Sequence, residues 1–239
     1  MKLVKEWKSV LFLLVLSACS KNTENVQQPQ PERFPYFGAA TAFAALSAGG
    51  VSNDGQSTIY GDLGVSPGAA LSGTETITRT GGTDHTNDNL AVQAQTDAKN
   101  SYDALSAETC TLDLSGKDLG GVTLNPGVYC FNDDAVLNGV LVLDAQGNPN
   151  ANFIFKVASN FHAGMGSIVL LVDNGETCNV LWQVAGTVSF DQDADITGAF
   201  LSIGGAVMSP GSKVNGKLLS QMGSIEIHSA QIYNNFCPL

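Results

Sequence analysis

Apolar residues in most of the chain occur in short runs separated by turn-forming residues. Val, Ile, Leu and Phe fill brief segments, and Gly, Asn-Gly or Pro-Gly interrupts the chain between them. Runs of this kind are typical of strands, and their spacing indicates a sandwich, a barrel or a solenoid. We expect strands at residues 58–60, 127–131, 140–143, 153–157, 168–172 and 180–184.

A loose repeat near the C-terminus favours the solenoid. Segments ending at Gly198 and Gly216 superpose with a period of 18 residues. The matching tripeptides are Ile196-Thr197-Gly198, Val214-Asn215-Gly216 and Ile232-Tyr233-Asn234, and the recurring apolar positions are Val188/Phe190, Ala206/Met208 and Ile225/Ile227, with Leu181, Leu201 and Leu219. One such turn cannot bury its apolar faces alone, so stacked turns of a β-solenoid are the predicted architecture.

One segment has helical periodicity instead. Between residues 86 and 107 apolar side chains recur every three or four positions without Gly or Pro, at Leu90, Ala94, Ala98, Tyr102 and Leu105. The spacing predicts an amphipathic helix, with Thr86 as its N-cap and Asp88 in its first turn. We expect this helix to lie along the solenoid and cover one apolar flank.

The N-terminus indicates export. Lys2, Lys5 and Lys8 precede an apolar run at 10–16, far shorter than the ~20 residues of a spanning helix, so a signal peptide is favoured over a transmembrane anchor. The tetrapeptide Leu16-Ser17-Ala18-Cys19 resembles a bacterial lipobox, in which Cys19 carries the lipid; a plain cleavage site is the alternative. We therefore expect an outer-membrane or cell-surface lipoprotein, or else a secreted protein.

Three regions follow from this assignment. Residues 1–18 form the leader, and residues 19–36 form a flexible tether rich in Asn, Gln and Pro. Residues 37–239 form one globular domain.

The charge balance excludes one class of partner. The chain has 11 basic and 22 acidic residues, and removal of residues 1–18 leaves 8 and 21. No basic cluster lies beyond the N-terminus, so a nucleic-acid partner is excluded. An anion of this strength is expected at a membrane only through its lipid.

The cysteine count agrees with export. Beyond Cys19 an even number remains, namely Cys110, Cys130, Cys178 and Cys237. Three pairings are possible in an oxidising compartment, and we prefer Cys110 with Cys130 and Cys178 with Cys237. Zinc is the weaker alternative, because no two of these cysteines have metal-ligand spacing.

Candidate catalytic and metal motifs are weak. His85, His162 and His228 are the histidines of the chain. A Gly-x-Ser-x-Gly string occurs once, at residues 64–68, and the phosphate-loop motif is incomplete, because Leu218 rather than Ser or Thr follows the Gly-x-x-x-x-Gly-Lys string at residues 211–217. Asp191, Asp193 and Asp195 resemble the start of a calcium loop, but the sixth and twelfth positions are Ile196 and Ser202 rather than Gly and Glu. A polysaccharide-cleaving solenoid would need clustered acids with basic residues, and Lys213 and Lys217 stand almost alone. The sequence predicts neither an enzyme nor a cofactor.

Several strings in order along residues 37–232 resemble the ice-binding-like protein family of polar bacteria, snow-mould fungi and sea-ice diatoms. They are Gly61-Asp62-Leu63-Gly64-Val65-Ser66-Pro67-Gly68, Ala94-Gln95-Thr96-Asp97, Leu124-Asn125-Pro126-Gly127-Val128-Tyr129, residues 143–151 with Phe153-Ile154-Phe155, and residues 178–184. The resemblance implies an irregular, discontinuous right-handed β-solenoid of triangular section, dominated by β-structure, with one long helix packed alongside. It also implies a capping head at residues 71–85, supported by a Cys110–Cys130 disulfide.

The family's activity is adsorption to ice, so the resemblance implies an ice crystal surface as the partner of a monomeric protein. Stretches matching the family's Thr-Ala/Gly-x-Thr/Asn motif are residues 54–57, 192–195, 210–213 and 229–232, and none has the threonines. The residues that the resemblance places on the ice-binding face are Ser57, Thr58, Gln192, Ala194, Ser212, Ser229 and Gln231. The shortage of threonine favours a rival, a surface adhesin or structural module that kept the scaffold without ice activity.

Overall fold

A computed structural model describes residues 37–68 and 70–234. The expected leader, the tether, the lipidation site Cys19 and the cysteine Cys237 lie outside the described residues.

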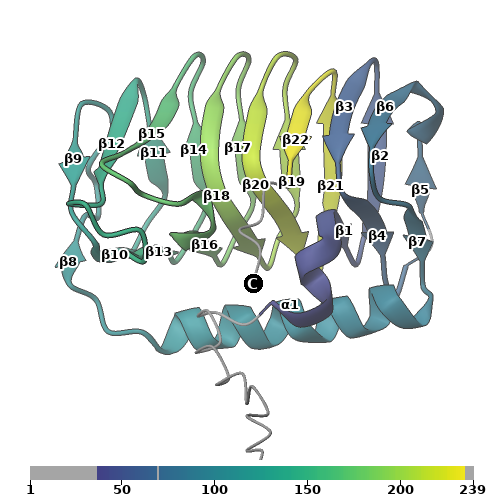
Figure 1. Cartoon of the computed structure of the whole chain (residues 1–239), viewed down its shortest axis with the longest axis horizontal. Coiled ribbons are helices and arrows are strands. Elements are labelled where there is room, and N and C mark those ends of the chain that lie inside the picture. The colour runs from purple at the N-terminus through teal and green to yellow at the C-terminus, as the bar shows by residue number, and fades with distance from the viewer. Residues whose placement is uncertain (1–36, 69, 235–239) are drawn as a thin grey trace, which may run out of the picture. The chain divides into compact units, whose positions relative to one another are not determined.

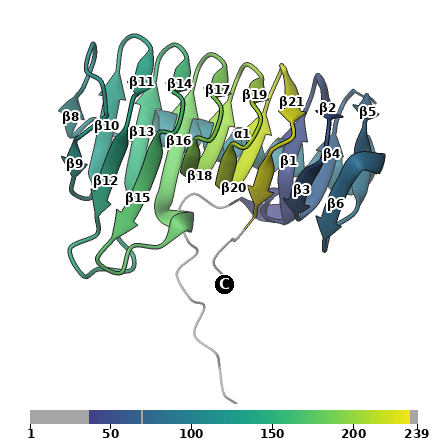
Figure 2. The same ribbon diagram turned by 90° about the horizontal axis from the view of Figure 1, so that it is seen from above.

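The strands stack into a β-solenoid with three faces (Figures 1 and 2). Every pairing between the described strands is parallel, so each turn lies in register on the next. The open face is formed by β9 (Thr123–Leu124), β12 (Val140–Asp144), β15 (Ile168–Val172), the first halves of β18 (Asp195–Ser202) and β20 (Lys213–Ser220), β22 (Gln231–Tyr233), β3 (Ser57–Tyr60) and β6 (Ile77–Thr80).

A narrow face and a helix-covered face complete the section. The narrow face contains β11 (Ala135–Leu137), β14 (Phe161–Ala163), β17 (Val188–Phe190), β19 (Ala206–Met208), β21 (Ser224–His228), β2 (Gly50–Asp54) and β5 (Leu71–Ser72). The helix-covered face contains β8 (Leu112–Asp113), β10 (Gly127–Phe131), β13 (Phe153–Val157), β16 (Val180–Val184), the second halves of β18 and β20, β1 (Phe43–Ser47), β4 (Asp62–Val65) and β7 (Asp84–Thr86). The short 3-10 helices are η1 (Gly38–Ala42), η2 (Thr74–Thr76) and η3 (Thr177–Asn179).

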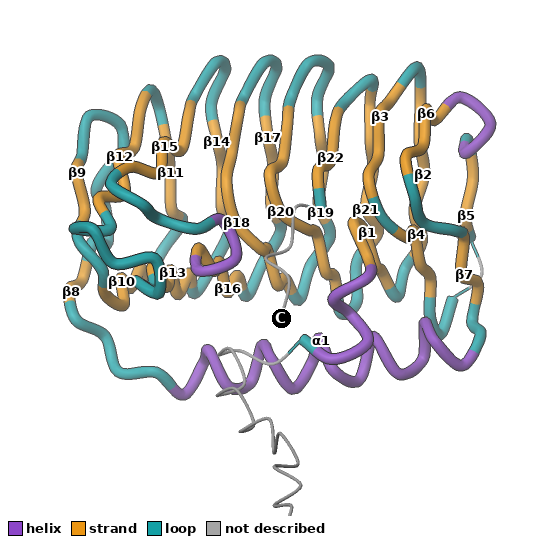
Figure 3. Tube along the Cα trace, viewed as in Figure 1, coloured by secondary structure: helices purple, strands orange, loops and turns teal. Residues whose placement is uncertain are grey.

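The order of turns in space differs from their order in sequence. The N-terminal strands β1, β2 and β3 stack directly on β20, β21 and β22. The helix α1 (Asn89–Ala107) then leads the chain back along the solenoid to its other end, where β8 begins the next series of turns (Figures 1 and 3). The solenoid is therefore discontinuous, as the family resemblance implied.

The 18-residue repeat is confirmed as the register of stacked turns. Gly198 pairs with Gly216, and Val214 pairs with Ile232. Both glycines lie where a long strand bends from the open face to the helix-covered face, at φ angles of +127° and +157°. A Cβ on Gly216 would lie 1.9 Å from the Gly198 carbonyl oxygen, so only glycine fits this close approach of two turns. One expected equivalence is wrong: Leu181 pairs with Ala199, and Leu201 pairs with Gln183.

Aromatic side chains fill the interior in a stack across successive turns. Phe155 and Trp182 lie parallel with centroids 3.9 Å apart, and Phe200 stacks on the other side of Trp182 at 5.3 Å. Trp182 also donates from Nε1 to the carbonyl oxygen of Thr197 at 3.1 Å. These residues are buried in the main hydrophobic core, so the solenoid interior is a packed core rather than a channel.

The helix α1 covers one apolar face, as predicted. Ala91, Ala94, Ala98 and Leu105 are buried in a second hydrophobic cluster, which includes Leu181, Leu201 and Leu219 from the solenoid. The N-cap is Asp88 rather than Thr86, and the Asp88 carboxylate accepts from the Ala91 N–H at 2.9 Å. Thr86 is the last residue of β7, so its backbone is held in the sheet instead.

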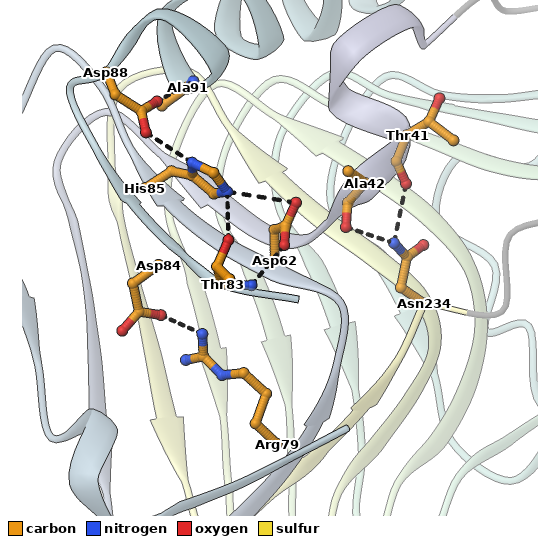
Figure 4. Close-up of polar contacts among 10 residues, drawn as sticks. All are labelled: Thr41, Ala42, Asp62, Arg79, Thr83, Asp84, His85, Asp88, Ala91 and Asn234. Atoms are coloured by element: carbon orange, nitrogen blue, oxygen red, sulfur yellow. Dashed lines mark hydrogen bonds and ion pairs between the residues drawn. The ribbon is translucent and has the colours of Figure 1, made fainter. Parts of the chain in front are cut away.

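His85 connects this helix start to the solenoid (Figure 4). Its Nδ1 lies 2.7 Å from Asp88 Oδ2, and its Nε2 lies 2.9 Å from Thr83 Oγ1 and 3.6 Å from Asp62 Oδ2. The pKa of Asp88 lies below its usual value, chiefly because its carboxylate accepts from the Ala91 N–H and then from His85. Asp88 therefore remains an effective N-cap acceptor well into the acidic range.

The segment expected to form a capping head is the terminal turn of the solenoid. Strands β5, β6 and β7 pair in register with β2, β3 and β4. At inward positions where other turns carry apolar residues, this turn has Arg79 opposite Ile59 and Asp84 opposite Leu63. Arg79 and Asp84 form an ion pair (Figure 4), so polar side chains cover the end of the core.

The Cys110–Cys130 disulfide is present, but the expectation that it supports residues 71–85 is wrong, because β10 lies at the opposite end of the solenoid from β5 and β7 (Figure 1). It joins the segment after α1 to strand β10 and so fixes the end of the helix connection to the solenoid. Cys178 is buried, and its expected partner Cys237 lies outside the described residues.

Candidate functional site

The three faces differ in what they can present to a partner. The helix-covered face is closed by α1. The narrow face has one outward column that includes His162 and Glu226, with His162 3.5 Å from Asp191 and His228 3.8 Å from Glu226. The open face has two outward columns on successive turns and is the broadest uncovered surface of the described solenoid (Figure 1).

The first outward column of the open face is continuous through the stacked turns, and the second is interrupted at β18, where Thr197 is buried. The first column is Val140, Ile168, Asp195, Lys213, Gln231, Thr58 and Thr78. The second is Thr123, Val142 and Leu170 at one end, and Asn215, Tyr233, Tyr60 and Thr80 at the other. Adjacent strands are spaced by about 4.8 Å, so equivalent side chains form regular ranks on a planar sheet.

Three of the residues expected on the binding face are buried and cannot touch an external surface. Ser57, Ala194 and Ser212 are each at most 2% exposed. Ser57 Oγ accepts from the Ala230 N–H, and Ser212 Oγ donates to the Ser209 carbonyl at 2.7 Å. These two serine side chains point into the corner between the narrow and open faces, where they satisfy backbone groups of the turns.

The other expected residues lie at the surface but are only partly brought together. Gln192 and Ser229 are exposed on the corner turns, which place them at the border of the open face. Thr58 and Gln231 are half-buried and are direct neighbours on adjacent strands of that face. Their place on the ice-binding face stays a prediction.

The sequence interpretation missed four aliphatic residues, which we call the aliphatic patch: Val140, Val142, Ile168 and Leu170. They project outward from β12 and β15, and Val140, Ile168 and Leu170 are 40%, 39% and 47% exposed. In sequence, these strands are apolar at consecutive positions, a pattern typical of strands buried on both faces. The signal was therefore present, but the pattern alone does not show that one side is uncovered.

A polar rank divides the open face. Lys213 Nζ lies 3.9 Å from Asp195 Oδ2, and Asn215 Nδ2 donates to Asp195 Oδ1 at 2.8 Å. On the far side of this rank are Thr58, Thr78 and Thr80 together with two stacked rings, Tyr60 and Tyr233, whose centroids are 4.8 Å apart. The open face thus has an aliphatic end, a charged middle and a threonine–tyrosine end.

The histidines and aspartates considered for metal binding are dispersed over the solenoid. Within residues 37–68 and 70–234, no group of three or more His, Cys, Asp or Glu side chains is placed to hold a metal ion. In the same part of the chain, no helix has the length and hydropathy needed to span a membrane.

The fold and the open face define a class of protein, namely a discontinuous parallel β-solenoid with an accessory helix that presents one planar, ranked surface to its surroundings. Comparison with known proteins gives the family. The family model described as ice-binding-like matches residues 45–233. The chain therefore belongs to the ice-binding-like family, which confirms the resemblance found in its motifs.

Relatives and solved structures agree over most of the chain. An ice-binding protein of Nostoc sp. (strain HG1) is 32% identical over 95% of this chain and 82% of the relative. The crystal structure of an ice-binding protein from the Antarctic ascomycete Antarctomyces psychrotrophicus superposes with a TM-score of 0.80 at 30% identity, covering 84% of this chain and 98% of that one. A second crystal structure, of an ice-binding protein from an Antarctic biological consortium, also gives a TM-score of 0.80 at 30% identity, covering 85% and 91%.

Proposed function

We propose that this protein binds ice by adsorption of its open face to the crystal surface, and that no chemical step is involved. The observation that carries the proposal is the open face itself, a planar array of in-register side chains over successive turns of the solenoid. Family membership and the names of the related proteins support the same activity.

The physical basis is the order of water at a rigid, repetitive surface. Water beside apolar groups keeps its hydrogen bonds mainly with other water molecules and loses orientational freedom. Side chains held on regular ranks, with β-branched residues restricted in χ1, present such water in a fixed arrangement. A layer ordered in this way can join the ice lattice with little further loss of entropy.

An ice-affinity capture experiment on residues 37–239 tests the proposal. The domain should be enriched in a slowly grown ice fraction and should inhibit recrystallisation, whereas an unrelated acidic protein of similar size should be excluded from ice. Exclusion of the folded domain from ice, with no recrystallisation inhibition at high micromolar concentration, would refute the proposal.

A surface adhesin or structural module is the second candidate. The charged Asp195–Lys213 rank and the buried serines at the motif positions favour it, because both depart from a uniform binding array. Binding to a glycan array by a domain that neither enters nor shapes ice would select this candidate.

We further propose that the protein is exported, anchored through a lipid on Cys19 and monomeric. The basic and apolar N-terminal pattern with its lipobox-like tetrapeptide supports export and lipidation. The described domain begins at Phe37, in the cluster beneath α1, so an anchor ahead of it is compatible with an accessible open face. A Cys19→Ser variant should move from the membrane fraction to the soluble fraction, and unchanged fractionation would contradict lipidation.

A further inference from the structure

The open face is uneven, and its aliphatic end carries an inference that rests on the proposed ice-binding function. Val140 pairs with Ile168 and Val142 pairs with Leu170, so four branched side chains form a two-by-two block on adjacent turns. Thr123 lies beside Val142 in the next turn and continues the block without charge. Contiguous apolar groups left exposed on a soluble domain commonly mark a contact surface.

The chemistry of the block suits contact with ordered water. Val140, Val142 and Ile168 are β-branched and therefore stiff at χ1, and all four positions lie on five-residue strands paired along their whole length. These side chains neither donate nor accept hydrogen bonds, so water above them must complete its hydrogen bonds with other water. The block thus provides a rigid surface that orders the water above it without forming hydrogen bonds to that water.

The rest of the open face is less suited to that task. Asp195 and Lys213 carry charges that hold hydration water in their own orientation. At the threonine–tyrosine end, the Tyr233 hydroxyl donates to the Gln231 side chain at 2.5 Å, and Tyr60 and Tyr233 raise two large rings above the sheet. Thr58 and Thr78 are flanked there by bulkier groups, which interrupt a flat array.

A second copy of the chain is a poorer occupant of the aliphatic patch. Four partly exposed side chains offer an area on the order of a few hundred Å², whereas a stable interface buries about 800 Å² per partner. The domain also carries a strong net negative charge, which opposes close association of two copies. An ice surface carries no net charge and is not limited in the area that it offers for contact. The aliphatic patch is also part of the open face, which is proposed to bind ice.

We propose that the aliphatic patch, formed by Val140, Val142, Ile168 and Leu170, makes the principal contact with ice, and that the Asp195–Lys213 rank is its boundary. The patch supplies most of the adsorption, while the threonine–tyrosine end contributes little.

Three double variants and one single variant of the domain 37–239 test this assignment. Ile168→Asp/Leu170→Asp places charge in the patch, and Ile168→Thr/Leu170→Thr keeps it small and uncharged. Thr58→Asp/Thr78→Asp places the same charge at the other end of the face. Val207→Asp is the matched control, because Val207 is also 39% exposed but lies on the narrow face. Circular dichroism and thermal melts establish that each variant is folded before its capture by ice is measured.

We expect Ile168→Asp/Leu170→Asp to lose at least about tenfold in the fraction captured by ice, as for central residues of an interface. Val207→Asp should stay within about twofold of the wild type, because Val207 lies outside the open face. Thr58→Asp/Thr78→Asp, which places the same charge at the other end of the open face, and Ile168→Thr/Leu170→Thr, which keeps the patch uncharged, should each lose less capture than Ile168→Asp/Leu170→Asp.

The other outcomes are distinguishable. If the wild type binds ice but Thr58→Asp/Thr78→Asp removes binding as strongly as the patch variant, the assignment is overturned and the proposed function stands. If the aspartates in the patch only abolish self-association, measured by sedimentation against concentration, the occupant is a second copy and the assignment is also overturned. If the folded wild type is excluded from ice, the proposed function itself fails.

Discussion

Lys217 gives the sharpest prediction from the structure, because a lysine is fully buried beneath η1. Its ammonium donates to the carbonyl oxygens of Ala40 at 3.2 Å and Thr41 at 2.8 Å, and it lies 5.3 Å from the centroid of the Phe37 ring. Burial lowers the pKa of Lys217 from 10.5 to about 7. The perturbation is Lys217→Met, which keeps a long side chain and removes the titrating group.

The sign follows from proton binding in the two states. Below pH 7 both the folded and the unfolded chain carry the proton, and the cost of burying the charge is fully present. Between about pH 7 and 10.5 the unfolded chain holds a proton that the folded chain lacks, so raising the pH favours the folded state. The whole effect is on the order of 5 kcal/mol, of which on the order of 1 to 2 kcal/mol is gained between pH 7 and pH 8.5.

Urea denaturation of both proteins at pH 7 and pH 8.5 measures this contribution. We expect the free energy of unfolding of the wild type to rise by on the order of 1 to 2 kcal/mol more than that of Lys217→Met. The absolute stability of the variant is not the test, because both carbonyls lose one donor. The Phe43 N–H still donates to the Ala40 carbonyl and the Asn234 side chain still donates to the Thr41 carbonyl (Figure 4). Equal increments in the two proteins would refute the assignment of the pKa to Lys217.

Three further predictions concern the face, the core and the disulfide. Replacing the charged rank by Asp195→Thr/Lys213→Thr should extend the uncharged array and raise thermal hysteresis at equal concentration, whereas unchanged or lower hysteresis would show that the rank does not limit binding. Trp182→Ala removes the centre of the aromatic stack and should lower the free energy of unfolding, measured by urea denaturation, by about 3–5 kcal/mol. The control Met222→Ala, at an exposed turn, should change it by less than about 0.5 kcal/mol. Similar losses in both variants would contradict the packing argument. Cys110→Ser/Cys130→Ser should lower the free energy of unfolding by about 2–4 kcal/mol under oxidising conditions. Under reducing conditions the wild type loses the disulfide too, so the two proteins should be equally stable. A difference that persists after reduction would point to another cause.

The strands, the helix and the stacked repeat could be predicted from the sequence because each depends on local patterns. All six expected strands match within one residue at each end, with residues 127–131, 153–157, 168–172 and 180–184 identical to observed strands. The recurrence of Gly198 and Gly216 marked the register, since the bend of each turn requires a residue without a Cβ at the same place. The shape and packing of one turn are therefore determined by residues that are close in sequence.

Other features depended on contacts between distant residues, and only the tertiary structure decided them. The stacking of β1 on β20 joins residues about 170 positions apart, and no local pattern specifies it. The same is true of exposure. Ser57 and Ser212 are small polar residues that turned inward to satisfy backbone groups, whereas Val140 and Leu170 belong to apolar runs that remained uncovered on one side. The type of a side chain favours a buried or an exposed location, but the fold of the whole chain determines what covers each face of a sheet. The tertiary structure therefore decided which residues of this protein can contact an external surface.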